Sequence, residues 1–169
     1  MVVVAFVGIE QGVVVAAILA LAQRTRLAAR PRDTILGREP GTVHWIPPDV
    51  GLPTEQVPGV VVYLLYAPFW YGDATHVVGR LRQALDVAPQ PVHALVLDAD
   101  GMSDIDYTGA RALGQLAAEL RHRGVHLGVA RTSHLVHHDL KHSGLLDDIG
   151  ADNLFSSVQD AVTGLSQRP

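Results

Sequence analysis

Residues 91–120 constrain the fold more than any other stretch, because they join a short apolar run, a polar loop and a helix pattern. The apolar run covers residues 92–97 and is followed by Asp98. Apolar residues then recur at positions 110, 113, 116, 117 and 120. The run predicts a buried strand, and the three- and four-residue spacing predicts a helix with one face on a core. Functional loops of open α/β sheets lie at the carboxyl ends of strands, so the polar loop is the best candidate site.

The rest of the chain from residue 59 onward continues this alternation. We expect strands at 59–66 and 125–130 and a one-faced helix at 71–85. Near the end, Ser133 and either Ser156 or Ser157 are candidate caps of two further helices. Strands that alternate with helices predict a largely parallel sheet covered by helices.

The predicted architecture is an α/β fold whose core covers residues 59–169. Its central sheet is mixed but mostly parallel, with about four to five strands flanked by four to five helices. Residues 31–58 are rich in proline and glycine, which predicts a linker and turns around one short first strand at 42–46. A hydrophobic helix is expected before this linker.

The N-terminal stretch, residues 1–22, is apolar apart from a single charge, Glu10. As a helix it would be about 33 Å long, roughly the thickness of a bilayer core. Five arginines follow between residues 24 and 38, against one acid, Asp33, as at the cytoplasmic end of a membrane helix. We therefore predict a transmembrane helix with its basic flank over residues 1–30, in the cell membrane, with the chain cytoplasmic from about residue 24. Gly8 and Gly12 would allow close helix approach, and Glu10 would face other helices or water.

Two other interpretations of residues 1–22 stay open. A secretory signal peptide would explain the Ala-Leu-Ala sequence at 20–22, although the basic residues follow the apolar run instead of preceding it. A buried strand or helix of a soluble fold would accommodate Glu10 and Gln11 more easily. Because a single membrane helix has little to do alone, the pattern favours the tail of a longer membrane protein.

The net charge and the cysteine content argue against some classes of function. The net charge of −4 argues against a general nucleic-acid-binding protein, which usually carries a basic face. The chain contains no cysteine, so it has neither disulfides nor thiolate metal sites.

The sequence LVLDADGMSDIDYTGARAL, followed by a helix, a glycine and a short strand, resembles the STAS domain. That domain is shared by sulfate-permease-type anion transporters and anti-sigma factor antagonists. Four further segments resemble the transporter branch specifically: GIEQGVVVAAILAL (8–21), LGREPGT (36–42), APFWYGDA (67–74) and GLLDDIGADNLFSSVQDAV (144–162). The chain departs from that branch at Leu64, where a basic residue is common, and at Asp73, where asparagine is common.

The resemblance implies a non-enzymatic regulatory domain at the cytoplasmic C-terminus of a secondary transporter of sulfate or related anions. In anti-sigma factor antagonists the hydroxyl of a D-x-S-G motif is phosphorylated, and the matching hydroxyl in this chain is that of Thr108. Partner or nucleotide binding would then use the loop after the central strand. Its candidate residues are Asp98, Ser103, Asp104, Asp106, Thr108, Gly109 and Arg111.

The resemblance further implies four partners: the membrane part of the same transporter, a regulatory protein, a kinase and a nucleotide, GTP or ATP. The sequence contains neither a P-loop nor a G-x-G-x-x-G motif. A free-standing phospho-switch like the anti-sigma factor antagonists is the alternative function.

Simpler explanations compete at several of these residues. Helix capping alone would account for Ser103 and Asp106. Gly109 costs a helix about 1 kcal/mol relative to alanine, which indicates a close approach by a ligand, a partner or a neighbouring strand.

Two alternatives involve other chemistry. Asp98 and Asp100 after an apolar strand resemble the nucleophile loop of haloacid-dehalogenase-type phosphatases, with Lys141 as the required lysine and the acidic pair at 147–148. His134, His138 and His142 have a spacing that can bind zinc, but no catalytic motif accompanies them, so we predict no metal site.

Overall fold

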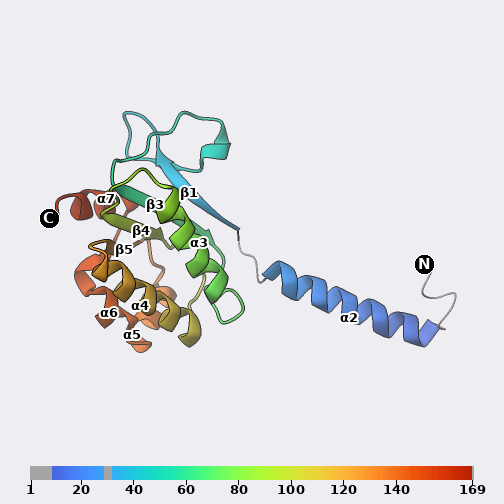
Figure 1. The fold of residues 1–169 in the computed structure, drawn as a ribbon. Coiled ribbons are helices and arrows are strands. Elements are labelled where there is room, and N and C mark those ends of the chain that lie inside the picture. Colours follow the sequence, from blue (N-terminus) through green and yellow to red (C-terminus); the bar gives the residue numbers. More distant parts are fainter. Residues whose placement is uncertain (1–8, 29–31, 169) are drawn as a thin grey trace. The chain divides into compact units, whose positions relative to one another are not determined.

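The computed structural model describes residues 9–28 and 32–168, and the chain divides into two compact units, residues 1–30 and 31–169. The first unit contains helix α2 (Ile9–Ala28), which is 20 residues long (Figure 1). Among the described residues, no helix combines the length and the apolar character needed to cross a membrane.

The predicted membrane helix over residues 1–22 overlaps α2 only from residue 9 onward, and residues 1–8 of that prediction lie outside the described residues. Glu10 and Gln11 lie in the first turn of α2, and Gln23, Arg24 and Arg26 lie in its last turns. The uninterrupted apolar run between them, residues 12–22, would extend only about 17 Å as a helix, against about 30 Å for a bilayer core. Gly8, the first member of the predicted glycine pair, lies outside the described residues.

The second unit is built on one mixed sheet with the strand order β2-β1-β3-β4-β5-β6. Strands β3 to β6 are parallel to one another, and β1 is antiparallel to both of its neighbours. The strands are β1 (Arg32–Arg38), β2 (Trp45–Ile46), β3 (Val60–Tyr66), β4 (Ala94–Asp98), β5 (His126–Ala130) and β6 (Leu154–Phe155).

Helices cover both faces of this sheet (Figure 1). They are α3 (Ala74–Val87), α4 (Tyr107–His122), α5 (His134–His142), α6 (Leu145–Ile149) and α7 (Val158–Ser166), with short 3-10 turns η1 (Pro48–Val50) and η2 (Ala151–Asn153). Helices α3 to α6 bury one face, to which β3 contributes Val61, Tyr63 and Leu65. Helix α7 buries the other face, to which the intervening residues Val60, Val62 and Leu64 contribute. Because both faces are covered, the central strands are continuous apolar runs.

Most of the predicted elements are confirmed, and the errors lie at the edges of the sheet. The sheet has six strands instead of four to five, because β1 forms within the expected linker and β6 within the expected closing helices. The expected strand at 42–46 shrinks to β2. Strand β1 escapes detection because only Ile35 and Leu36 are apolar among its seven residues, and its partner β3 fixes its conformation.

A partly buried ionic cluster holds the start of β1 in place. The carboxylate of Asp33 accepts hydrogen bonds from the Arg80 guanidinium at 3.0 and 3.1 Å and from the Tyr63 hydroxyl. Burial alone would raise the pKa of Asp33, but the hydrogen bonds from Arg80 and Tyr63 outweigh it and hold the pKa below its ordinary value. Burial and the neighbouring carboxylate raise the pKa of Tyr63. The cluster thus ties β1 to β3 and to α3.

Candidate functional site

The polar loop starts at the carboxyl end of β4 with an ion pair between a buried aspartate and a partly exposed arginine. The side chain of Asp98 is completely buried and accepts hydrogen bonds from Nε of Arg131, at 2.9 Å, and from Nη2 of the same guanidinium. Arg131 directly follows β5, which pairs with β4 in parallel register, so the two side chains meet across neighbouring strand ends. Asp100 lies 3.4 Å from the same guanidinium. This two-point contact fixes the conformation of the first residues of the loop.

Arg131 has a backbone φ of 58°, in the left-handed region that few residues other than glycine adopt. Its backbone N–H donates to the Phe155 carbonyl at 3.0 Å, which anchors β6 at the same point. No local pattern in the sequence pointed to Arg131. The available signal was an arginine placed directly after one buried strand while an aspartate ends the neighbouring strand.

Asp106 joins the loop to the segment that precedes α3. One carboxylate oxygen caps α4 by accepting from the Gly109 N–H at 2.7 Å, and the other accepts from the Tyr71 N–H at 2.8 Å. Phe69 forms a parallel bridge with Ile105 in the same region. The expectation that Asp106 caps the helix is confirmed, and the same side chain also fixes residues 69–71.

Gly109 is required by a close approach of the backbone, as predicted. A Cβ at this position would lie 2.4 Å from the carbonyl oxygen of Phe69 and 2.9 Å from its carbonyl carbon. The approaching group is therefore the neighbouring segment of the same chain. This contact explains why a residue that weakens helices stands in the first turn of α4.

Asp73 is a second buried carboxylate beside the loop. It is 1% exposed at the start of α3, and its Oδ1 accepts from the Trp70 N–H at 2.9 Å. Its buried Oδ2 has no hydrogen-bond partner in the described structure. Burial raises the pKa of Asp73 above its ordinary value, the charge of Asp106 raises it further, and the hydrogen bond from Trp70 only partly opposes this. The ionised form of Asp73 therefore places an unfavourable charge here.

The remaining predicted loop residues are exposed. Ser103 and Asp104 lie in the loop, and Thr108 is the second residue of α4, with its hydroxyl in the first turn. Arg111 lines a cavity of about 360 Å³ together with Tyr107 and residues of α6. The structure thus brings Asp106, Thr108 and Gly109 together in one helical turn, whereas Asp98 is directed towards Arg131.

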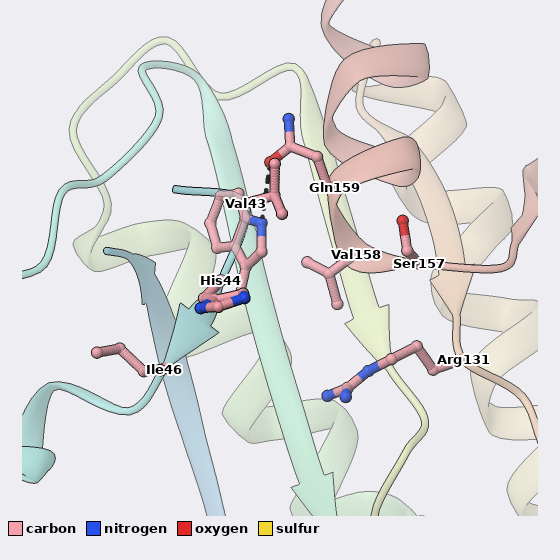
Figure 2. Close-up of a pocket in the computed structure, with 8 residues that line it drawn as sticks. Val43, His44, Ile46, Arg131, Ser157, Val158 and Gln159 are labelled. Atoms are coloured by element: carbon pink, nitrogen blue, oxygen red, sulfur yellow. Dashed lines mark hydrogen bonds between the residues drawn. The ribbon is translucent and has the colours of Figure 1, made fainter. Parts of the chain in front are cut away.

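A pocket of about 410 Å³ lies next to the Asp98–Arg131 pair, between β2 and the start of α7 (Figure 2). The indole N–H of Trp45 donates to the Gln159 side chain at 3.2 Å and closes one side. Figure 2 shows the side chains of Val158 and Arg131 pointing into the space next to His44. Arg131 is therefore the residue that connects this pocket to the loop.

The geometry bears on two alternative functions, a phosphatase that uses Asp98 as its nucleophile and a zinc site formed by the histidines of α5. A phosphatase nucleophile must reach its substrate, but Asp98 is fully buried and held by Arg131. The rings of His138 and His142 are 4.1 Å apart on α5. Within the described ranges, no group of three or more histidine or acidic side chains is arranged to hold a metal ion.

Comparisons with known proteins agree on one family. A family model for the STAS domain matches residues 52–161. A probable sulfate transporter of Mycobacterium tuberculosis is 33% identical over 161 residues, which are 95% of this chain and 29% of that protein. The chain therefore spans less than a third of the length of such curated relatives.

Two solved structures show the extent of the similarity. The murine Slc26a9 anion transporter in its inward-facing state matches 96% of this chain and 27% of that chain, with a TM-score of 0.84 and 20% identity. An anti-sigma factor antagonist from Mycobacterium paratuberculosis matches 67% of this chain and 91% of that chain, with a TM-score of 0.55 and 18% identity. Both similarities concern the fold.

Proposed function

This chain belongs to the STAS domain family, in the form found in sulfate transporters, and we propose that it is the cytoplasmic regulatory domain of a secondary anion transporter. The observation that carries the proposal is the extent of the alignment. The sulfate transporter relative aligns with 95% of the chain, including residues outside the STAS match, whereas the antagonist fold accounts for 67%. A free-standing switch would need neither α2 nor its basic flank. The domain itself would carry out no chemical reaction, in keeping with its relatives.

The membrane part of the same protein is the first partner that we propose. Strand β1 starts at Arg32, which is in register with Tyr66 at the carboxyl end of β3. The chain therefore enters the second unit at the edge of the sheet that carries the loop of residues 98–111. Only a short stretch of chain would separate the membrane part from a contact at this edge. Such a contact would also lie next to the proposed regulatory loop.

Thr108 is the residue at which we propose control by a kinase. A phosphate there would lie at the first turn of α4, where free N–H groups and the helix dipole favour negative charge. It would compete with Asp106 for these N–H groups, and its charge would repel the Asp106 carboxylate. Because Asp106 also holds the Tyr71 N–H, the modification would release the segment before α3 as well.

The size and compartment of the native protein test the proposal. Membrane and soluble fractions would be separated and probed with an antibody against residues 32–168. A band far above 18 kDa in the membrane fraction is the expected result. A band near 18 kDa in the soluble fraction would refute the transporter proposal and favour the free-standing switch.

A further inference from the structure

Exposed aromatic side chains gather at one edge of the second unit. Tyr66, Trp70, Tyr71 and Tyr107 are 50%, 38%, 76% and 69% exposed, and we call these four residues the aromatic rim. Every other aromatic side chain that the structure describes is buried or half-buried. Aromatic rings left in water at one place mark a contact surface more often than single scattered residues do.

The two segments that carry the rim residues lie side by side. The Phe69 N–H donates to the Asp104 carbonyl at 3.0 Å, and the Asp106 N–H donates to the Phe69 carbonyl at 3.0 Å. The Tyr71 N–H reaches the Asp106 carboxylate, and Tyr107 is the next residue along the chain. At the other end of the rim, a Cβ on Gly101 would lie 3.1 Å from the Tyr66 ring.

The surroundings of the rim are acidic. The two segments, residues 66–73 and 98–111, contain five aspartates and a single basic residue, Arg111. Arg131 adds a positive charge that is 37% exposed, and its guanidinium contacts the carboxylates of both Asp98 and Asp100. Arg32 lies beside Tyr66 at the margin. The exposed carboxylates next to the rings are that of Asp104 and that of Asp100, which lies 3.4 Å from the Arg131 guanidinium.

We propose that the aromatic rim binds an arginine- or lysine-rich peptide segment on the cytoplasmic side of the membrane part. The faces of tyrosine and tryptophan rings attract guanidinium and ammonium groups, and neighbouring carboxylates complement the same charge. Cytoplasmic segments next to membrane helices carry an excess of these residues. This inference rests on the proposed function, because it names the chemistry of the partner at that edge.

The probe is a fluorescein-labelled peptide of twelve residues with alternating arginine and alanine, titrated with the whole chain of 169 residues. A peptide with glutamate in place of arginine is the charge control. The double variant Tyr71→Leu/Tyr107→Leu keeps apolar surface and removes two ring faces. Asp104→Asn removes one carboxylate at the rim, and Asp86→Asn removes one at the far end of α3. Thermal melts establish that each variant is folded.

We expect the arginine peptide to bind about tenfold more weakly to the double tyrosine variant, several-fold more weakly to Asp104→Asn and unchanged to Asp86→Asn. Equal affinity for the wild type and the tyrosine variant would overturn the proposal. So would tyrosine-dependent sedimentation with phosphatidylglycerol vesicles without peptide binding, because the occupant would then be the lipid surface. If the rim fails this test while the native protein still proves to be a large membrane protein, only this inference falls.

Discussion

Replacement of Gly109 by alanine should loosen the candidate regulatory loop, although alanine favours helices. The new Cβ would lie 2.4 Å from the Phe69 carbonyl oxygen, and backbone atoms cannot rotate away as a side chain can. Residue 109 or residue 69 must therefore move by about 1 Å. Overpacking of this kind typically lowers the free energy of unfolding by about 1–3 kcal/mol. The same movement strains the hydrogen bond from the Gly109 N–H to Asp106.

Helix propensity opposes this cost by about 1 kcal/mol. We place the clash at the upper end of its range because both contacts are with backbone, so Gly109→Ala should lose about 2 kcal/mol of unfolding free energy. Gly79→Ala is the matched control, because Gly79 lies within α3 and a Cβ there meets nothing within 4 Å. That variant should gain about 0.5–1 kcal/mol.

Urea denaturation followed by far-ultraviolet circular dichroism would measure both free energies of unfolding. The two identical substitutions should shift the midpoint in opposite directions. If Gly109→Ala is as stable as the wild type, the close approach of Phe69 does not determine the residue at this position, and our explanation of the loop is wrong.

Three further predictions concern the buried charges. Arg131→Met should cost about 1–3 kcal/mol of unfolding free energy, because it leaves the buried Asp98 carboxylate with only the Asp100 N–H as a donor, and adding Asp98→Asn should restore much of the loss. Asp73→Asn should raise the stability at pH 7 by about 1–3 kcal/mol, since it removes a buried charge with an unpartnered oxygen. Because the pKa of Asp73 is raised in the folded state, this gain in stability should shrink as the pH falls from that raised pKa towards the ordinary pKa of aspartate. Urea titrations at several pH values would measure the gain, and a gain that does not change with pH would contradict the prediction. Asp33→Asn should be less stable than the wild type at pH 7. Because the pKa of Asp33 is lowered in the folded state, this difference in stability should disappear as the pH falls from about 4 downward. A difference that persists in acid would contradict the role of the cluster with Arg80.

The sequence predicted the centre of the fold better than its edges. The strands β3, β4 and β5 are apolar runs because both faces of the sheet are covered, and such runs are visible without a structure. Helix starts were predictable where a side chain caps the first turn, as Ser133 does by accepting from the Val136 N–H. Strands β1 and β6 were not, because their conformation depends on pairing with neighbours that are distant in sequence.

The candidate site followed the same pattern. The roles of Asp106 and Gly109 were predictable because capping and close approach leave local signals in the sequence. Arg131 lies 33 residues from Asp98, and only the parallel pairing of β4 with β5 brings the two together. The role of Asp73 depends on burial, which a single residue letter does not show.

Sulfate uptake by the full-length protein tests the central claim most directly. Cells would express the protein with an N-terminal tag, either intact or without the segment 34–169, and the amount in the membrane would be measured by immunoblot alongside uptake of radiolabelled sulfate. If the domain is regulatory, we expect the deletion to impair sulfate uptake or assembly of the protein in the membrane. Unchanged uptake at an unchanged membrane level would contradict the claim.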